Sequence, residues 1–422
     1  MDDFIQMGER DIWGGQRRPF GLSLASRQQH LHVIGGSGTG KSTLLLSMFE
    51  QDVRLGRGCS IIDPHGDLAS RALSLVPRER VNDVVYFAPA DLEHPIGFNL
   101  LANVPADRRH LVTDAIVSAF QSIWRDSWGP RLQYILSNAI AALTECENVT
   151  LLSVQRMLVD GRYRDWVTRQ VTDPIVRRYW LIEFATMDSR LRSEAISPIL
   201  NKVGSLLLSG PLRNVLGQVS TRLDIPFIMD RNKILVADIS KGRLGEAASG
   251  LIGALLVSSF YTASLWRADQ PEADRAPHAL LVDEFQNFAG TNFADILSES
   301  RKFKLSIALF HQHLEQIAPE VRDAVAANAA NTIAFRTSEK NAETLSRQCG
   351  GFYPPSTFSG LPNHTVVARL LDGGEHLDPF IGHTLPPPVG ADRVKERIIR
   401  YCRQRYSTPR AGVEDRLRQW MA

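Results

Sequence analysis

A glycine-rich turn, placed between an apolar segment and a leucine-rich segment, constrains this chain more than any other feature. Residues 31–34 are apolar apart from one histidine, residues 35–43 read GGSGTGKST, and a leucine-rich pattern with helical spacing follows. This order matches G-x-x-x-x-G-K-[ST] between a strand and a helix, the context in which the motif forms a phosphate-binding loop. The sequence therefore predicts a strand–loop–helix unit and, with it, an α/β fold.

The residues of this loop are of the types that bind a nucleoside triphosphate. Glycines let the backbone N–H groups turn inward around phosphate oxygens, and the helix N-terminus adds partial positive charge. We expect Lys41 to reach the β- and γ-phosphates and the Ser42 hydroxyl to ligate Mg²⁺. The alternative, a flexible glycine turn, leaves the flanking strand and helix unexplained. We predict that ATP and Mg²⁺ bind to Gly35, Gly36, Ser37, Gly38, Thr39, Gly40, Lys41, Ser42 and Thr43.

Length and charge set limits without specifying an activity. With 422 residues, the chain is long enough for two domains, or for one large α/β domain with an insertion. Its 48 basic and 46 acidic residues give a formal net charge of +2, which neither requires nor excludes nucleic acid. A basic surface would have to be local, such as loops that face the pore of a ring.

The cysteines and the N-terminus indicate a cytoplasmic protein. Cys59, Cys146, Cys349 and Cys402 lack C-x-x-C spacing, so we expect reduced thiols and neither disulfides nor a zinc site. The first nine residues include Asp2, Asp3 and Glu9 and lack the basic and apolar regions of a signal peptide.

Residues 247–266 form a run of twenty residues without a charge, which is the length of a membrane span. The run contains several serine and threonine residues and lies between two predicted core strands. A helix that is buried on several sides in an α/β protein has the same composition. We therefore expect a buried helix at this position.

Predicted strands and helices alternate over most of the chain, which argues for a mostly parallel sheet covered on both faces. From about 105 to 220, strand signals nearly vanish and apolar residues recur at helical spacing. We predict a nucleotide-binding domain of residues 1–104 and 221–422, interrupted by an all-helical domain at 105–220. Residues 1–29 are expected to form a polar lead-in, and the last thirty an arginine-rich amphipathic helix. Strands are predicted at 59–63, 84–87, 233–239, 278–285, 304–310 and 331–337.

Two adjacent carboxylates supply the second element that nucleotide hydrolysis needs. Asp283 and Glu284 follow the apolar residues 280–282 at the predicted end of a strand. We expect Asp283 to hold Mg²⁺, directly or through water, and Glu284 to polarise the attacking water. Alone, this pattern also describes an ordinary strand end, but together with the P-loop it indicates a catalytic pair.

The strand predicted at 304–310 leads into His311, Gln312 and His313. A polar residue at the tip of the strand beside the Asp–Glu strand can contact both the γ-phosphate and water, so Gln312 is the candidate sensor. A solvated loop amide is the alternative. The two histidines stand two residues apart with no third ligand in view, and we expect them to be loop residues and not metal ligands.

Hydrolysis in a ring of subunits usually requires a cation from the neighbouring subunit. Arg301 lies between the two catalytic strands and is the candidate, although a solvated surface arginine is the default for this position. The rival candidates, all in the helical insertion, are Arg131, Arg190 and Arg192.

The segment DPHGDL, residues 63–68, follows the second predicted strand. The Asp63 carboxylate closes that strand, so it could approach the nucleotide or a subunit boundary. Equally, Pro64 and Gly66 could form a turn and Asp67 could cap the next helix. The sequence leaves both interpretations open.

The segments GGSGTGKST, IIDPHGDLA, LLVDEFQNF and FHQHLEQI occur in this order with a helical insertion, and together they resemble the HerA/FtsK superfamily of P-loop ATPases. The most similar group comprises conjugative, type IV secretion coupling proteins of the TraG/TraD kind and their soluble relatives. The resemblance covers about residues 20–385. It implies a RecA-like core with an inserted all-helical domain, and six subunits arranged as a ring around DNA.

The resemblance also implies roles for individual residues. In that superfamily the arginine finger lies between the Asp–Glu strand and the glutamine strand, where this chain has Arg301, and the glutamine falls on Gln312. The segment SKGRLG, with Lys241 and Arg243, is a candidate DNA-facing stretch.

The chain also departs from these relatives before its P-loop. Membrane-bound coupling proteins begin with transmembrane helices and HerA begins with a β-barrel, and about thirty residues leave no room for either. We expect either a separate protein that supplies the membrane tether or a cytosolic translocase.

Three functional hypotheses follow. The first is a homohexameric ATPase that moves DNA through a central channel. The second is a recruitment platform, in which the helical domain binds protein substrates or a relaxase and ATP acts as a switch. The third is a HerA-like motor that works with a nuclease. A small-molecule kinase fits less well, because the Asp–Glu pair and the distal glutamine suit activation of water.

Overall fold

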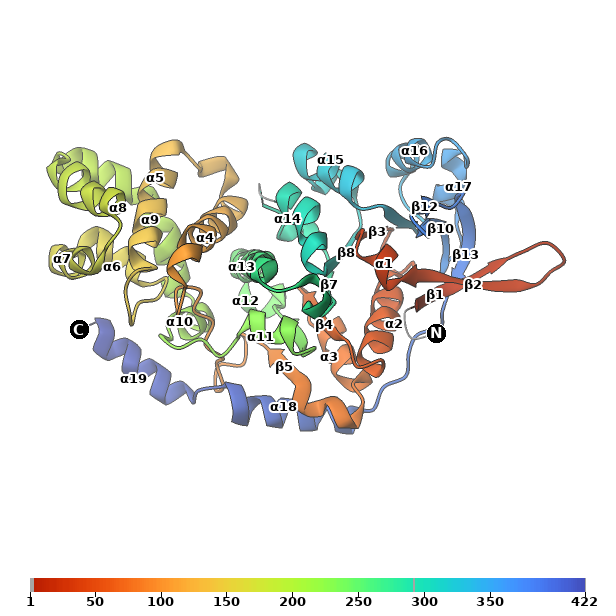
Figure 1. Cartoon of the computed structure of the whole chain (residues 1–422), viewed down its shortest axis with the longest axis horizontal. Coiled ribbons are helices and arrows are strands. Elements are labelled where there is room, and N and C mark those ends of the chain that lie inside the picture. The colour runs from red at the N-terminus through yellow and green to blue at the C-terminus, as the bar shows by residue number, and fades with distance from the viewer. Residues whose placement is uncertain (1–3, 291–292, 422) are drawn as a thin grey trace. The chain divides into compact units, whose positions relative to one another are not determined.

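A large sheet organises the computed structural model, which describes residues 4–290 and 293–421 (Figure 1). All pairings from β9 to β6 are parallel, whereas β9, β10, β13, β1 and β2 pair in antiparallel fashion. This confirms the predicted α/β class with a mostly parallel core. In sheet order, the eleven strands are β2 (Arg17–Ser23), β1 (Phe4–Asp11), β13 (Phe380–Thr384), β10 (Thr365–Arg369), β9 (Asn331–Ala334), β3 (Leu31–Ile34), β8 (Leu305–His311), β7 (His278–Val282), β4 (Gly58–Asp63), β6 (Ile234–Asp238) and β5 (Val84–Phe87).

The central strands of this sheet are buried along their whole length. Every residue of β3, β4, β6, β7 and β8 is buried. Parallel strands that are covered on both faces have such nearly continuous apolar sequences, which is why the residues 61–62, 235–237 and 279–282 could be recognised as strands. A separate two-stranded ribbon consists of β11 (Leu371–Asp372) and β12 (Glu375–His376).

The polar lead-in predicted for residues 1–29 is wrong, because its described part forms the hairpin β1–β2 and joins the sheet. Ile5 and Met7 of β1 and Phe20 and Leu22 of β2 are buried, and Gly8, next to Met7, is buried as well. In Figure 1 the hairpin projects beyond β13, and the side chain of Trp13 at its tip is 99% exposed. The strand alternation was hidden by the arginines and by a register shift between Gln6 and Gly8.

The chain divides into two compact units. One comprises Met1–Tyr86, Pro226–Asp238 and Ala263–Tyr401, and it contains the sheet. The predicted boundaries of a helical domain, 105 and 220, differ from these limits and remain a prediction. The helices that lie mainly in the sheet unit are α1 (Leu24–Arg27), α2 (Lys41–Arg54), α3 (Asp67–Leu75), α11 (Ile225–Asp230), α14 (Phe293–Glu299), α15 (Pro319–Asn328), α16 (Glu339–Gln348), α17 (Pro355–Gly360) and α18 (Asp392–Tyr406).

The second unit, Phe87–Ile225, Ile239–Thr262 and Cys402–Ala422, is largely helical. A π-helix, Tyr179–Phe184, places Tyr179, Trp180 and Phe184 in its core, where their rings contact one another. The helices that lie mainly in this unit are α4 (Arg109–Ile123), α5 (Pro130–Leu143), α6 (Ser153–Val159), α7 (Gly161–Gln170), α8 (Pro174–Arg178), α9 (Ser189–Leu208), α10 (Gly210–Leu216), α12 (Lys241–Leu244), α13 (Glu246–Trp266) and α19 (Arg410–Met421).

The uncharged run and the cysteines behave as the sequence predicts. The helix at Glu246–Asp269 is long and apolar enough to cross a membrane, but 83% of its apolar window is buried inside the protein. All four cysteines are buried, and none of them forms a disulfide. The C-terminal region differs from prediction, because a break at residues 407–409 separates α18 (Asp392–Tyr406) from α19. Pro409 cannot donate a backbone hydrogen bond, which explains the break.

Candidate active site

Three segments that are far apart in the sequence meet at the carboxyl ends of β3, β8 and β7. β8 lies between the other two strands, with Ile34 of β3 opposite His311 of β8. The glycine loop follows β3, Gln312 follows β8, and the Asp283–Glu284 pair follows β7. Carboxyl ends of parallel strands are the usual place for ligand sites in α/β sheets. The sheet order therefore brings all of these candidates together.

The glycine loop folds back on itself and ends at the N-terminus of α2. Thr39 Oγ1 donates to the Gly36 carbonyl at 2.8 Å, and Lys41 Nζ donates to the carbonyls of Gly35 and Gly36 at 2.6 and 3.0 Å. Lys41 is the first residue of the fourteen-residue helix α2. The first turn of a helix has unpaired N–H groups, so this end of α2 suits an anion.

Two glycines of the loop have no room for a side chain. At Gly40, φ is +125°, and a Cβ would lie 2.9 Å from Phe335 Cε1 and 2.9 Å from His364 Nδ1. At Gly35, a Cβ would lie 2.5 Å from Phe335 Cβ. The loop is thus a tightly packed structure and not a flexible turn.

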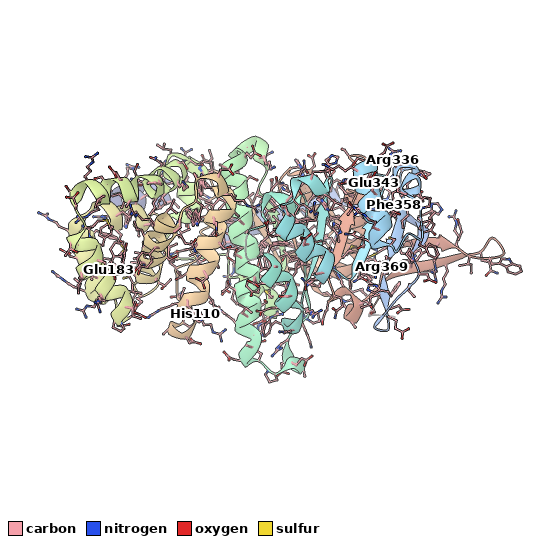
Figure 2. The ribbon with its side chains drawn as sticks, turned by 90° about the horizontal axis from the view of Figure 1, so that it is seen from above. His110, Glu183, Arg336, Glu343, Phe358 and Arg369 are labelled. Carbon is pink, nitrogen blue, oxygen red and sulfur yellow. The ribbon has the colours of Figure 1, made fainter. Side chains whose placement is uncertain are left out.

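The outer rim of the loop consists of residues that the sequence analysis missed. The backbone N–H of Gly36 donates to the Arg336 carbonyl, and that of His364 donates to the Thr39 carbonyl, each at 2.8 Å. Arg336 Nη2 donates to Asn363 Oδ1 at 3.0 Å, and His364 has a left-handed backbone with φ +63°. Figure 2 shows Arg336 at the same end of the molecule as Phe358. No motif marks this region, so no sequence signal pointed to it.

Glu284 has both carboxylate oxygens occupied by amide donors. Gln312 Nε2 donates to Oε1 at 2.5 Å, and Gln286 Nε2 donates to Oε2 at 2.7 Å. The backbone of Glu284 is left-handed (φ 46°, ψ 48°), and its carbonyl accepts from Asn287 Nδ2 at 2.8 Å. A glutamate rarely adopts this conformation, and such residues concentrate at functional sites.

Charges at the site are unbalanced. Burial, together with the carboxylates of Glu284 and Asp63, raises the pKa of Asp283 to about 7. Burial lowers the pKa of Lys41, while Glu284 and Asp283 act in the opposite direction. One ammonium group thus faces several buried carboxylates, and a divalent cation would neutralise this excess.

The residues present fit a magnesium ion. Ser42 is exposed at the first turn of α2, next to Lys41, and Asp283 is 6% exposed. These two would hold Mg²⁺, which prefers one or two protein oxygens together with water and phosphate oxygens. The described part of the chain contains no group of three or more His, Cys, Asp or Glu residues that could hold a metal.

Asp63 has a structural role that corrects one of the two interpretations of DPHGDL. Its Oδ1 accepts from the N–H of His65 and its Oδ2 from the N–H of Ala69, both at 2.8 Å. Asp63, and not the exposed Asp67, therefore satisfies a backbone donor in the first turn of α3. Its carboxylate still affects the active site, because it contributes to the raised pKa of Asp283.

Arg301 lies at the opposite end of the sheet from Lys41. It is exposed just before the start of β8, and its Nη1 donates to Gln29 Oε1 at 2.8 Å. The seven residues of β8 separate it from Gln312 by roughly 23 Å. Arg301 therefore cannot reach the phosphate site of its own chain.

His311 is not the loop residue that the sequence analysis expected. It belongs to β8 and is buried, and its ring stacks on His32 of β3 with the centroids 4.8 Å apart. The two Nε2 atoms lie 2.6 Å apart, and burial lowers the pKa of His32 to about 4. A neutral, hydrogen-bonded pair allows these polar rings to remain in the sheet core.

The remaining predicted residues lie in the helical unit, away from the glycine loop in sequence. Arg190 pairs with Glu194 on the surface, Arg192 Nη2 donates to the carbonyls of Ala185 and Met187, and Arg131 is exposed on α5. Lys241 and Arg243 belong to the short helix α12.

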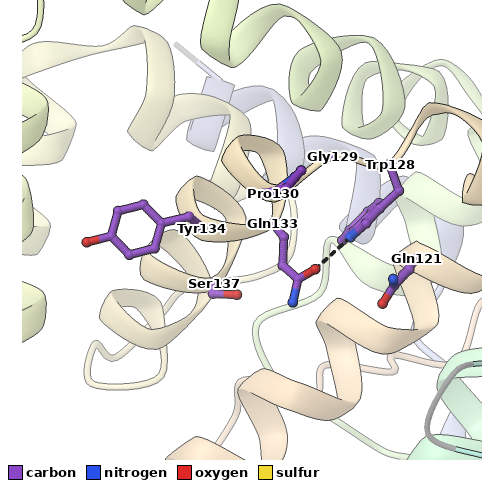
Figure 3. Close-up of a pocket in the computed structure, with 7 residues that line it drawn as sticks. All are labelled: Gln121, Trp128, Gly129, Pro130, Gln133, Tyr134 and Ser137. Atoms are coloured by element: carbon purple, nitrogen blue, oxygen red, sulfur yellow. Dashed lines mark hydrogen bonds between the residues drawn. The ribbon is translucent and has the colours of Figure 1, made fainter.

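A pocket of about 550 Å³ opens in the same unit, and none of the predicted site residues lines it. Figure 3 shows Trp128 and Gln133 facing each other, with the Trp128 Nε1–H donating to Gln133 Oε1 at 3.0 Å. The lining residues are Gln121, Trp128, Gly129, Pro130, Gln133, Tyr134 and Ser137.

Solved structures with this fold include a bacterial conjugative coupling protein and VirB4. The bacterial conjugative coupling protein TrwBdeltaN70, in an unbound form, matches with a TM-score of 0.64 and 17% identity over 92% of this chain and 90% of that chain. The plasmid coupling protein TrwB in complex with ADP and Mg²⁺ gives 0.62 and 16%, over 92% and 97%. VirB4 of Thermoanaerobacter pseudethanolicus gives 0.59 and 14%, over 91% and 96%. These TM-scores show a common RecA-like P-loop fold, although the sequence identities are low.

Two family models match the sequence, whereas no curated protein matches it. The model described as the TraM recognition site of TraD and TraG covers residues 277–357, which include Asp283, Glu284 and Gln312. The model described as the central domain of helicase HerA covers residues 14–256, more than half of the chain, and includes the whole glycine loop. The chain therefore belongs to the family of the HerA helicase central domain, and its fold is that of the conjugative coupling proteins.

Proposed function

We propose that this protein is an ATP-hydrolysing motor that assembles as a homohexamer and moves DNA through a central channel, in the manner of a type IV secretion coupling protein. The observation that carries the proposal is the hydrogen bond between Gln312 and Glu284 beside Lys41. This bond brings the candidate base, Glu284, and the candidate sensor, Gln312, together next to the phosphate-binding loop, at the ends of the adjacent strands β7, β8 and β3.

Each part of this site has a chemical role in hydrolysis. The N–H groups of residues 35–43 and the Lys41 ammonium would bind the triphosphate, and Ser42 and Asp283 would hold Mg²⁺, which would neutralise phosphate charge. Glu284 orients a water molecule and takes its proton, and Gln312 senses the γ-phosphate. TrwB has been crystallised with ADP and Mg²⁺ and with an ATP analogue, which supports these ligands for a chain of the same fold.

The position of Arg301 suits a role across a subunit interface. It is exposed and cannot reach its own phosphate site, so in a ring it would serve the nucleotide held by Lys41 of the neighbouring subunit. An arginine supplied in this way raises the rate about 10³- to 10⁵-fold.

DNA would bind mainly through its phosphates. Lys241 and Arg243 on α12 are the proposed pore contacts, and Arg243 is exposed. Because such contacts release counterions, affinity should fall steeply with salt and depend little on sequence. We place the protein in the cytoplasm, where a membrane-bound protein, a relaxase or a nuclease would be its partner.

A second function, a recruitment platform switched by ATP, is favoured by one feature of the helical unit. Ile175, Leu181 and Ile182, on α8 and the adjoining π-helix, are 77%, 52% and 51% exposed. Exposed apolar side chains in a cluster often mark a protein-binding surface. Such a surface suits protein cargo better than DNA.

One experiment separates the two functions. ATPase rate is measured against protein concentration, with and without single- and double-stranded DNA, for the wild type and the Lys41→Ala variant. A motor requires a rate per subunit that rises with concentration and is stimulated by DNA. Stimulation by a protein partner alone would support the platform, and equal rates for wild type and Lys41→Ala would overturn both.

A further inference from the structure

Gln286 makes contacts at the active site that the proposed hydrolysis does not yet use. It lies two residues after Glu284 in the 3₁₀ turn Phe285–Asn287 and is partly buried. Its Nε2 donates to Glu284 Oε2 at 2.7 Å and to Gln316 Oε1 at 3.2 Å. Both amide hydrogens are therefore used, and one of them fixes the carboxylate from the side opposite Gln312.

The other end of the same amide is an acceptor without a donor. Gln286 Oε1 is buried, and no donor within residues 4–290 and 293–421 reaches it. The orientation of the amide is set by chemistry, because an ionised Glu284 can only accept and Nε2 must face it. A buried acceptor that lacks a partner costs stability, and such an atom calls for a functional explanation.

We propose that Gln286 completes the water-activating site: its Nε2 positions Glu284, and its Oε1 accepts the O–H of the attacking water that Glu284 does not take. This inference rests on the proposed function. In the step it serves, the water oxygen forms a bond to the γ-phosphorus, and the bond from that phosphorus to the β–γ bridging oxygen breaks. One water proton passes to Glu284, and the products are ADP and phosphate.

Gln286 is needed because the Glu284 carboxylate must be held by two donors, one on each oxygen. Gln312 alone would leave Glu284 free to rotate about its terminal bond, since only Oε1 would be held. With Gln286 on Oε2, the carboxylate plane is fixed at two points, and the water has an acceptor for each of its hydrogens. The left-handed backbone of Glu284 starts the turn that places Gln286 within reach of its side chain.

The test is a double-mutant cycle on the full-length protein with ATP and Mg²⁺. Gln286→Met keeps the size of the side chain and removes both polar ends, and Gln286→Ala is a second variant in case methionine disturbs folding. We expect kcat to fall about 10²- to 10³-fold with an ATP Kd within about twofold of wild type, as for loss of one preorganised polar contact. Gln316→Ala, which removes only the exposed secondary contact, is the matched control and should change kcat less than threefold, roughly.

The Glu284→Gln background distinguishes positioning from general structural damage. If Gln286 acts through Glu284 and its water, Gln286→Met should have no further effect on the residual single-turnover rate in that background. The same fold loss in both backgrounds, or wild-type turnover of both Gln286 variants, would overturn the inference. Failure of the proposed function looks different, because Glu284→Gln itself would then hydrolyse ATP at the wild-type rate.

Discussion

Glu284 combines a strained backbone with a fully engaged side chain, and both features concern hydrolysis more than binding. Glu284→Gln should bind ATP with wild-type affinity and lose hydrolysis about 10²- to 10⁴-fold, the usual contribution of a general base. Nucleotide binding is followed by fluorescence and turnover by phosphate release. Hydrolysis at the wild-type rate would assign the base to another residue.

Gly40 is the loop position that combines a positive φ with close packing around its Cα. Gly40→Ala should destabilise the protein by about 1–3 kcal/mol through a strained backbone and should weaken ATP binding, because a Cβ meets Phe335 and His364. Gly56→Ala is the matched control, since Gly56 also has a positive φ but nothing lies within 4 Å of its Cβ position. Urea unfolding and ATP titration of both variants make the comparison; equal ATP affinities would contradict the expected role of close packing.

At the residue scale, the sequence predicted the motif residues and missed those that support them. The Lys41, Asp283, Glu284 and Gln312 side chains follow recognisable strands, so their meeting could be foreseen from the parallel sheet. Other residues hold these in place: the Gln286 side-chain amide contacts Glu284, and backbone groups of Arg336 and His364 contact the glycine loop. Backbone contacts of this kind leave no signature in residue type.

Among the elements, α1 and α2 are joined by a buried ion pair. Arg27 Nη1 and Nη2 each lie 2.6 Å from an oxygen of Asp52, and the two side chains are 4% and 1% exposed. Asp52→Ala leaves a buried guanidinium without its partner and should cost about 3–5 kcal/mol.

A surface pair on the same helix provides the control for this prediction. Glu50 and Arg54 form an i,i+4 pair in α2 in which the arginine is 64% and the glutamate 17% exposed, and Glu50→Ala should cost about 0.5 kcal/mol. Urea unfolding measures both variants. Similar losses would mean that the buried pair contributes no more than a surface pair.

Helices and strands could be predicted from the sequence where a single pattern of apolar residues ran through the whole element. Fully buried strands such as β4 and β8 appear as apolar runs, and α13 appears as an uncharged run whose burial was foreseen from its serines. The hairpin β1–β2 was missed because few of its residues are both apolar and buried, and arginines interrupt their alternation. The hydrogen bond from the Ala69 N–H of α3 to Asp63 was missed because Asp63 belongs to the preceding strand.

For the whole molecule, buried histidines should make the fold sensitive to acid. Burial first, and then Arg267 and Arg27, lower the pKa of His278 to about 3 from an ordinary 6.5. Between these values the unfolded chain binds a proton that the folded chain does not, so stability falls as pH is lowered through this window. At pH 5 the loss is about 2 kcal/mol for this residue.

The raised pKa of Asp283 makes the folded state more stable as pH falls, which opposes the effect of His278. The variant His278→Gln removes only the contribution of His278 to the pH dependence. When pH is changed from 7.5 to 5, the unfolding free energy of the wild type should fall by about 2 kcal/mol more than that of the variant. Urea unfolding at both pH values gives this difference. Parallel pH dependences would mean that His278 titrates normally in the folded protein.

The assembly prediction concerns Arg301. Arg301→Ala should bind ATP normally and lose concentration-dependent turnover, and mixing it with Lys41→Ala should restore part of the activity at mixed interfaces. Arg190→Ala, which removes an exposed arginine paired with Glu194, should turn over like wild type. Loss of ATP binding in Arg301→Ala would argue that the residue supports its own fold and not a neighbour.

The hydrogen bond from His364 to Thr39 extends the nucleotide site beyond its motifs. The His364 carbonyl accepts from the N–H of Thr384, which is paired with Gly8 of the N-terminal hairpin. All three residues lie outside the segments that the two family models recognise, residues 14–256 and 277–357. A fragment limited to those segments would retain every motif residue but would lack the hydrogen bond from His364 to Thr39. The conformation of the glycine loop therefore depends on the antiparallel part of the sheet as well as on the parallel strands that carry the motifs.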